Sequence, residues 1–207
     1  LFTKTVVVSP RFLFVIKIDQ SLFLKQYGSS SAEVVLTKET TMPFHWPDNS
    51  QPNQLLQVKV AEGSWDWSGA LSISSIANFA IQCKNLEDFG IYKLVNVQVK
   101  LMNCTAYVVF EEEDENQCSY RIENHSKYTS MLVYQHKSKS QSRWVNVNTY
   151  SAFAWAQPLN EHRISIEFFD GALEDYPVQT GAKYSFSFDK INQTYMIKIM
   201  KTSEIGH

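Results

Sequence analysis

Apolar residues recur at every second position over most of this 207-residue chain. Alternation of this kind predicts β-strands with one buried and one solvated face, as in antiparallel sandwiches. No window of about eleven residues keeps the i, i+3, i+4, i+7 apolar spacing of an amphipathic helix. The sequence therefore predicts an all-β chain, with strands that include residues 57–60, 71–76, 78–83, 96–102, 184–188 and 196–200.

A second constraint is an aromatic phrase that occurs twice, as "MPFHWPD" and as "SAFAWAQPL". The pairs Phe44 and Phe153, Trp46 and Trp155, and Gln26 and Gln135 are each 109 residues apart. A constant offset over such a distance predicts two tandem copies of one antiparallel β-sandwich. An aromatic side chain in a β-rich chain is more often core than binding site, so we expect Trp46, Trp155, Phe44 and Phe153 to belong to the repeat core.

The acidic run "EEEDEN" at Glu111–Asn116 falls where the first copy should end. Adjacent like charges disfavour a packed strand, so this run is interpreted as a solvated linker. We place the first sandwich repeat at residues 1–115 and the second at residues 116–207.

Charge and motif content exclude several classes of function. With 19 basic and 21 acidic residues the net charge is −2, which argues against nucleic-acid binding. The five histidines lack metal-ligand spacing, and there is no glycine-rich phosphate loop or intact G-x-S-x-G motif. We expect no catalytic residues, no metal and no cofactor.

Targeting signals are also missing. No apolar run approaches the roughly 18 residues of a membrane helix, so we expect that the chain does not cross a bilayer. It begins at Leu1 without a signal peptide and is interpreted as part of a longer protein.

The cysteines and the glycosylation sequons point to different compartments. Cys83, Cys104 and Cys118 are odd in number and form no C-x-x-C pair, which favours reduced thiols in a cytosolic protein. Sequons at Asn103, Asn124 and Asn192 would matter only in a secretory compartment. Two functions stay open: an intracellular peptide-binding module, and an extracellular carbohydrate-binding β-sandwich with exposed coplanar aromatics and oxidised cysteines.

Several segments carry a resemblance to a known family. They are "VVVSPRFLFVIKIDQSLFLKQYG", "MPFHWPD", "WSGALSI", "YRIENHSKYTSMLVYQ", "SAFAWAQPL" and "KYSFSFDKINQTYMIKIM". Together they resemble the adaptor-binding domain, or Shrubby-binding region, of the vacuolar protein sorting thirteen family. The likeness covers nearly the whole chain.

That resemblance implies a fold and a function. Members of the family are very long bridge-like lipid-transfer proteins at organelle contact sites. Their adaptor-binding domain has six β-sandwich repeats and recognises Pro-x-Pro motifs in organelle-specific adaptors. By this resemblance, the chain would contain the fifth and sixth of these repeats. The implied location is cytoplasmic and peripheral, at organelle membranes such as Golgi or endosome, with membrane association only through adaptors.

The family also has a characteristic asparagine near the opening strand of each repeat. In the second repeat this asparagine maps onto Asn124, whose side chain can bond adjacent backbone groups and hold a structural turn. The first repeat departs from the pattern, with Val15 or Ile16 at the corresponding point.

A Pro-x-Pro segment is extended before it binds, so we expect it to add as a strand to a sheet edge with its prolines in apolar pockets. The candidate strands lie in the second repeat, although apolar residues of this kind more often belong simply to the core. The candidate peptide-binding residues are Tyr184, Phe186, Phe188, Tyr195, Ile197 and Ile199.

Overall fold

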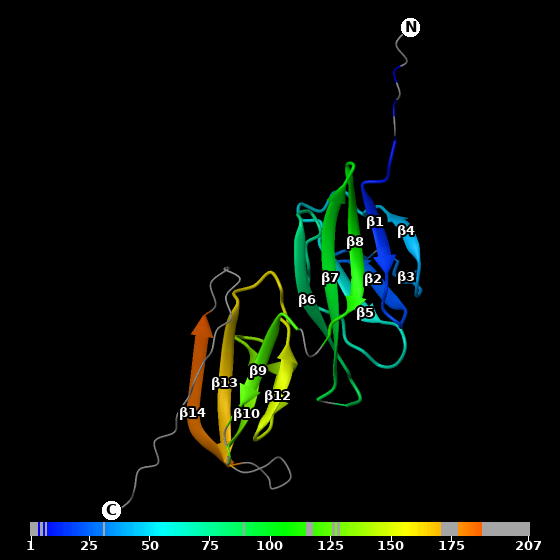
Figure 1. Ribbon diagram of the computed structural model, residues 1–207. Coiled ribbons are helices and arrows are strands. Elements are labelled where there is room, and N and C mark those ends of the chain that lie inside the picture. Colours follow the sequence, from blue (N-terminus) through cyan, green and yellow to red (C-terminus); the bar gives the residue numbers. More distant parts are fainter. Residues whose placement is uncertain are drawn as a thin grey trace, which may run out of the picture.

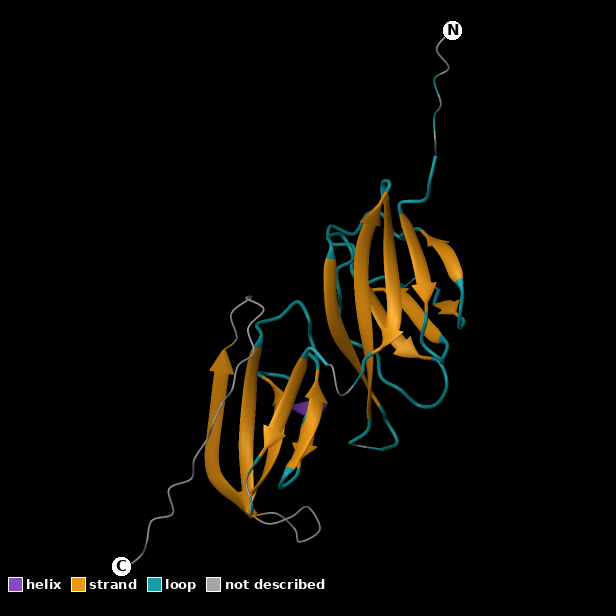
Figure 2. Cartoon of the chain, in the orientation of Figure 1, coloured by secondary structure: helices purple, strands orange, loops and turns teal. Residues whose placement is uncertain are grey.

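The computed structural model describes residues 4, 6, 8–30, 32–88, 90–114, 118–125, 127 and 129–170, together with the backbone of residues 178–187. Nearly all regular structure in these residues is β-strand, apart from one 3-10 turn, η1 (Lys139–Gln141) (Figures 1 and 2). The predicted all-β sandwich fold is confirmed.

The first eight strands form two sheets. They are β1 (Phe12–Ile16), β2 (Leu22–Gln26), β3 (Val34–Leu36), β4 (Thr41–Phe44), β5 (Leu56–Val60), β6 (Ala77–Lys84), β7 (Tyr92–Met102) and β8 (Thr105–Glu112). One sheet has the order β4-β1-β8-β7-β6, and the other has the order β3-β2-β5. In Figure 1 the five-stranded sheet lies in front of the three-stranded sheet.

The remaining strands form a second pair of sheets. They are β9 (Tyr120–Asn124), β10 (Thr129–Gln135), β11 (Arg143–Val145), β12 (Thr149–Phe153), β13 (Arg163–Asp170) and β14 (Val178–Ser187). The order is β11-β10-β13-β14 in one sheet and β12-β9 in the other.

Alternation in the sequence becomes alternation in burial. Strands β1, β2 and β5 each bury their first, third and fifth residues and leave the second and fourth partly exposed. The buried positions of both sheets face one another, so apolar side chains meet in the space between the sheets. This packing makes each group of strands a sandwich.

Aromatic rings form the centre of the first core. Phe14 stacks on Phe44 with ring centroids 4.4 Å apart and meets Phe110 edge-on at 5.7 Å. Trp46 lies edge-on to Phe44 at 5.1 Å and is 8% exposed. The burial of such large apolar surfaces is the main stabilising contribution to the sandwich.

The second core repeats the same pair of rings. Trp155 lies edge-on to Phe153 at 5.2 Å and to Tyr120 at 5.4 Å, and it stacks on His162 at 4.5 Å. Trp155 is 4% exposed and Phe153 is 2% exposed. Each Phe-x-Trp phrase therefore places its two rings between the sheets of one sandwich.

Two features of the strand pairing differ from the sequence predictions. The pair β1 and β8 is parallel, whereas all other strand pairs among the described residues are antiparallel. Residues 71–76 form only an isolated bridge from Leu71 to Leu56, although Leu71 and Ile73 are buried. The alternation correctly predicted that Leu71 and Ile73 are buried. A strand also requires hydrogen bonds to a neighbouring strand, which alternation does not predict.

The acidic run is only partly a linker. β8 continues through Glu112, and Glu113 is buried, with its Oε1 accepting a hydrogen bond from the Ser119 backbone N–H at 2.9 Å. The predicted boundary between residues 115 and 116 lies outside the described residues. The solvated-linker prediction was wrong for Glu111–Glu113, because pairing with β7 and the contact with Ser119 outweigh the repulsion of like charges.

Candidate functional site

The predicted peptide-binding residues lie at the margin of the described structure. Tyr184 and Phe186 belong to β14, of which only the backbone is described. Phe188, Tyr195, Ile197 and Ile199 lie outside the described residues. β14 ends the order β11-β10-β13-β14, so one of its edges pairs with no other strand in the described part of the chain.

Asn124 is the last residue of β9 and is 4% exposed. Its Nδ2 donates to the carbonyl oxygen of Thr129 at 2.9 Å and to that of Val145 at 3.1 Å. These two bonds join the end of β9 to the start of β10 and the end of β11. The amide thus satisfies backbone acceptors from two other strands, which is a strand-positioning role.

Strand register decides which residue of the first sandwich corresponds to Asn124. Phe12 pairs with Phe44, as Tyr120 pairs with Phe153. Counting four residues along each opening strand brings Phe12 to Ile16 and Tyr120 to Asn124. Ile16 is 1% exposed, so an apolar side chain occupies the position of the asparagine.

Replacing Asn124 with alanine should destabilise the second sandwich by about 1–3 kcal/mol, because two buried carbonyl groups lose their donor. The loss is measured by denaturant unfolding. Asn78→Ala, at an exposed position of β6, is the matched control and should change stability by less than about 0.5 kcal/mol. A variant that unfolds like the wild type but loses a bound peptide would instead make Asn124 a contact residue.

Gln26 and Gln135 form the same paired hydrogen bonds in the two sandwiches. Gln26 Nε2 donates to the Asp48 carbonyl at 2.7 Å, and the Asp48 N–H donates to Gln26 Oε1 at 2.9 Å. Gln135 Nε2 donates to the Gln157 carbonyl at 3.0 Å, and the Gln157 N–H donates to Gln135 Oε1 at 2.7 Å. Each glutamine therefore holds the chain two residues after the tryptophan.

In the sequence, these glutamines served only to align the two repeats, and their paired hydrogen bonds to the backbone were not predicted. Both are 1% exposed, which is unusual for an amide side chain unless its polar atoms are paired. The sequence did contain a signal, because a glutamine at the same place in both repeats, at the end of an apolar strand, indicates a buried amide with hydrogen-bond partners.

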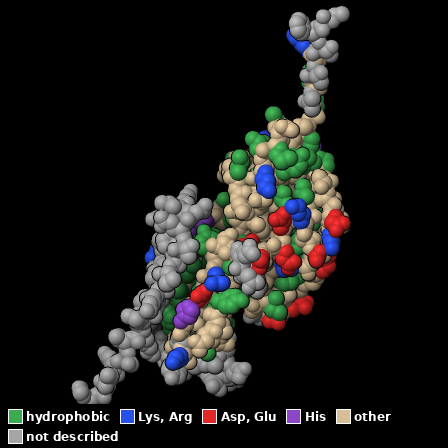
Figure 3. All heavy atoms as spheres, in the orientation of Figure 1, with side chains coloured by type: hydrophobic (Ala, Val, Ile, Leu, Met, Phe, Trp, Pro, Cys, Tyr) green, Lys and Arg blue, Asp and Glu red, His purple; other side chains and the backbone are tan. Residues whose placement is uncertain are grey.

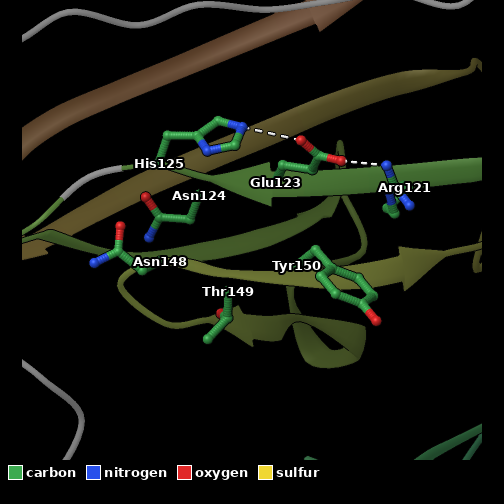
Figure 4. A pocket seen from close by; sticks show the side chains of 7 residues that line it. All are labelled: Arg121, Glu123, Asn124, His125, Asn148, Thr149 and Tyr150. Atoms are coloured by element: carbon green, nitrogen blue, oxygen red, sulfur yellow. Dashed lines mark hydrogen bonds and ion pairs between the residues drawn. The ribbon is translucent and has the colours of Figure 1, made fainter.

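A shallow polar depression lies over β9 and β12 (Figure 4). Glu123 forms an ion pair with Arg121 at 2.5 Å and a hydrogen bond with His125 at 2.9 Å. These two contacts, of which that with His125 has the larger effect, hold the pKa of the Glu123 carboxyl below its usual range. Tyr150 is 53% exposed and lies 5.4 Å from the Arg121 guanidinium. The full lining is Arg121, Glu123, Asn124, His125, Asn148, Thr149 and Tyr150.

The depression presents charged and aromatic groups to solvent. Its carboxylate has a lowered pKa and already accepts hydrogen bonds from Arg121 and His125, so it is a weak general base. An exposed tyrosine with a charged rim is a typical surface for a polypeptide segment.

The two sandwiches meet at a polar junction around Arg143. This residue is 6% exposed, and its Nη2 donates to Gln82 Oε1 at 2.9 Å. Its Nη1 donates to the Ala152 carbonyl, and its guanidinium lies 4.5 Å from the centre of the Tyr92 ring. Gln82 and Tyr92 come from the first sandwich, and Arg143 and Ala152 come from the second, so one side chain joins both.

The backbones also approach closely at this junction. Ile81 of β6 forms a parallel bridge with Trp155, and Figure 1 shows β6 at the side of the first sandwich nearest the second. A Cβ added at Gly69 would lie 2.2 Å from the Ala156 carbonyl oxygen and 2.8 Å from Gln157 Cα. Only glycine fits at this contact.

Gly69→Ala should therefore loosen the junction, at a cost of about 1–3 kcal/mol for the forced separation. Hydrogen exchange of β6 amides should become faster, while the amides of β2 should be unchanged. The control is Gly90→Ala, because a Cβ at Gly90 would meet no atom within 4 Å. Gly28→Ala is not a suitable control, because the φ of Gly28 is +74° and alanine would be strained there. Equal protection of β6 in Gly69→Ala and wild type would contradict the close approach.

The three cysteines differ in exposure. Cys83 is fully buried, Cys118 is half-buried and Cys104 is exposed. Burial raises the pKa of the Cys83 thiol to about 12, so that it stays protonated at neutral pH. No group of three or more His, Cys, Asp or Glu side chains could hold a metal ion within the described residues.

A thiol titration at pH 8 should separate the cysteines. We expect rapid reaction of Cys104, slower reaction of Cys118 and no reaction of Cys83 until denaturant is added, because the thiolate is the reactive form and Cys83 is protonated and enclosed. Unfolded protein provides the control, in which all three should react together. Equal rates in the native protein would show that the core opens readily.

The fold and these surfaces define an all-β class of interaction module, with buried amides that position the strands and charged and aromatic groups at its surface. None of the helical structure described is long and apolar enough to cross a membrane.

Comparison with known proteins places this module in a family. Residues 1–162 match the family described as vacuolar-sorting associated protein 13, adaptor binding domain, and the chain belongs to this family. It is 27% identical over 182 residues to the intermembrane lipid transfer protein vps13B of Dictyostelium discoideum, covering 83% of this chain and 3% of that protein.

Two further relatives have the same kind of name. Intermembrane lipid transfer protein vps13E of Dictyostelium discoideum is 25% identical over 207 residues, covering 91% of this chain and 5% of that protein. Intermembrane lipid transfer protein VPS13D of Homo sapiens is 25% identical over 166 residues, covering 75% of this chain and 4% of that protein. The chain thus spans only a few per cent of the length of these relatives.

Proposed function

We propose that this chain is a non-catalytic docking module of a bridge-like lipid-transfer protein, and that it binds Pro-x-Pro motifs of organelle adaptors to target that protein to membrane contact sites. The observation that carries the proposal is the match of residues 1–162 to the adaptor-binding domain family. The names of the relatives, which are intermembrane lipid transfer proteins, support the role of the larger protein.

We further propose that the two sandwiches, residues 1–115 and 116–207, are tandem copies of one repeat, the last two of an array. The paired hydrogen bonds of Gln26 and Gln135 support this, since they hold equivalent points behind Trp46 and Trp155. The edge-on rings of Phe44 with Trp46 and of Phe153 with Trp155 support it as well. Shared buried polar geometry is harder to reach by chance than shared apolar residues.

The peptide would bind by strand addition at the second sandwich. Because β14 is the last strand of its sheet in the described part of the chain, its outer edge offers N–H and C=O groups to an incoming strand. Proline donates no backbone hydrogen bond, which suits an edge where only alternate groups of the ligand point inward. We propose that the apolar pockets are formed by Tyr184, Phe186, Phe188, Tyr195, Ile197 and Ile199.

A pull-down with a Pro-x-Pro peptide array tests the proposal. Replacing either proline by alanine should abolish binding, whereas affinity should change little between low and high salt, because few ion pairs would be screened. A steep salt dependence with tolerated proline changes would point to a charge-driven contact and contradict this mode. A double variant Tyr184→Ser/Phe186→Ser in β14 should lose the peptide if that edge is used.

In the cell the module would be cytoplasmic and peripheral, reaching organelle membranes such as Golgi or endosome through its adaptors. Lipid transport would belong to the rest of the protein, since the chain covers only a few per cent of its relatives. In this proposal the adaptor determines which organelle is reached, and the module binds the adaptor.

A further inference from the structure

The outer face of sheet β3-β2-β5 carries an open group of basic and aromatic side chains. Alternation directs Leu22, Leu24 and Leu36 into the core, so the residues between them face outward. Register places Val35, Phe23 and Lys59 in one row across the three strands, and Lys25 lies on the same face of β2. Val35 is 49% exposed, and the other three are half-buried.

Trp67, from the segment after β5, completes this group. The Lys25 Nζ lies 4.1 Å from the centre of a Trp67 ring, and the Lys59 Nζ lies 4.7 Å from it. Lys59 also lies 5.1 Å from the Phe23 ring centre. We refer to Phe23, Lys25, Val35, Lys59 and Trp67 as the basic-aromatic face.

The two lysines of this face lack acidic partners. Within the part of the chain that the structure describes, neither Lys25 nor Lys59 forms an ion pair with a carboxylate. The outward residues of β2, β3 and β5 include no acidic side chain. By contrast, acidic and basic side chains are intermixed on the side of the first sandwich shown in Figure 3. Both lysines of the basic-aromatic face are therefore without a contacting carboxylate among the described residues.

The corresponding face of the second sandwich is closed. Register equates Lys25 with Tyr134 and Lys59 with Glu167, and both of these are 2% exposed. The Glu167 carboxylate accepts hydrogen bonds from the Tyr134 hydroxyl at 2.6 Å and from Lys139 at 2.7 Å. One sandwich thus buries this face with its charge paired, while the other presents it to solvent.

We propose that the basic-aromatic face docks a second, acidic polypeptide segment in which carboxylates alternate with aliphatic side chains. Lys25 and Lys59 are diagonal neighbours across β2 and β5, a separation of about 7–8 Å. Carboxylates two residues apart on an extended strand are separated by about 6.8 Å. One extended segment can therefore direct both carboxylates at the two lysines, while its aliphatic side chains point away from the sheet.

The geometry favours a peptide over a membrane surface. Interfacial membrane binding requires apolar side chains that reach beyond the charged groups into the lipid. Here Phe23 and Trp67 are half-buried, with lysine ammonium groups 4.1–5.1 Å from their ring centres, so neither ring projects as a free apolar anchor. A segment whose carboxylates share one face can contact the lysines directly. This surface is separate from the proposed Pro-x-Pro site.

The test uses the 207-residue chain and a fluorescein-labelled peptide, Gly-Ser-Leu-Glu-Leu-Glu-Leu-Gly-Ser, followed by anisotropy. Binding should be at least fivefold weaker for the same peptide with glutamine at both glutamates. The Lys25→Gln/Lys59→Gln variant should weaken binding of the acidic peptide by about fivefold to tenfold, which is the effect of losing two exposed charge pairs.

The matched control is Lys100→Gln/Lys127→Gln, which removes the same charge at exposed positions outside this face. It should bind the acidic peptide like the wild type, and thermal melts should show that both variants fold. Equal weakening in both double variants, or equal affinity for the two peptides, would overturn the proposal.

A vesicle arm separates a membrane from a peptide as the partner. Co-sedimentation uses vesicles of phosphatidylserine and phosphatidylcholine in a 3:7 ratio. Vesicle binding that depends on Lys25 and Lys59, without binding of the acidic peptide, would also overturn the proposal. Failure of this docking surface leaves the Pro-x-Pro test unaffected, because that test uses a different peptide and different variants.

Discussion

A Trp155→Ala variant is expected to lose about 3–5 kcal/mol of folding free energy, because a large buried ring is removed and leaves a cavity. Trp155 is 4% exposed and contacts three rings, those of Phe153, Tyr120 and His162. It also forms the bridge to Ile81 at the junction. Denaturant unfolding, followed by circular dichroism, should show an early transition of the second sandwich.

The matched variant is Trp46→Ala in the first sandwich. Trp46 contacts Phe44 and Phe12 in the corresponding place, so its loss should shift the transition of the first sandwich by a similar amount. A loss below about 1 kcal/mol in either variant would mean that the ring is not part of a tightly packed core. Because the chain has two sandwiches, the transitions should be analysed separately.

An Arg143→Ala variant is expected to cost about 3 kcal/mol, concentrated at the junction between the sandwiches. The change leaves Gln82 Oε1 and the Ala152 carbonyl without this donor and removes a cation from the Tyr92 ring. Hydrogen exchange should accelerate in β6 and β12, and small-angle scattering should show a wider distribution of inter-sandwich distances.

Lys84→Ala provides the comparison for Arg143. The Lys84 Nζ donates to the Ser140 carbonyl at 2.5 Å across the same junction but is at the surface. An exposed contact of this kind is worth well under about 1 kcal/mol. Equal stability of the Arg143→Ala and Lys84→Ala variants would contradict the conclusion that the buried Arg143 guanidinium stabilises the junction.

The junction bears on the proposed docking function. If Arg143 and its partners hold the two sandwiches as one body, an adaptor that contacts both the edge of β14 and the basic-aromatic face would gain effective concentration without new contacts. The same adaptor would lose that gain in the Arg143→Ala variant.

The alternation of apolar residues by itself determined the fold class and most of the core. Residues such as Leu22, Leu24, Val58 and Val60 are buried where the two-residue period predicts. The constant offset likewise identified Phe-x-Trp as a paired feature, and both tryptophans lie in a core. These properties are local in origin, since the period of a strand sets which side chains share a face.

Long-range pairing was decided only by the tertiary structure. The parallel pair β1 and β8 joins segments more than ninety residues apart, and alternation is blind to strand direction. Residues 71–76 alternate without becoming a strand, because no neighbour offers them a ladder. Register also placed Ile16 at the position of Asn124, where the sequence left Val15 and Ile16 equally possible.

The exposure of surface residues was also decided only by the tertiary structure. Lys25 and Tyr134 occupy equivalent positions on alternating strands, yet Lys25 is half-buried and Tyr134 is 2% exposed. The paired hydrogen bonds of Gln26 and Gln135 likewise depend on backbone groups 22 residues away. A strand's own sequence specifies which side chains share a face, but only the packing of distant segments determines whether that face is covered, paired or left open for a partner.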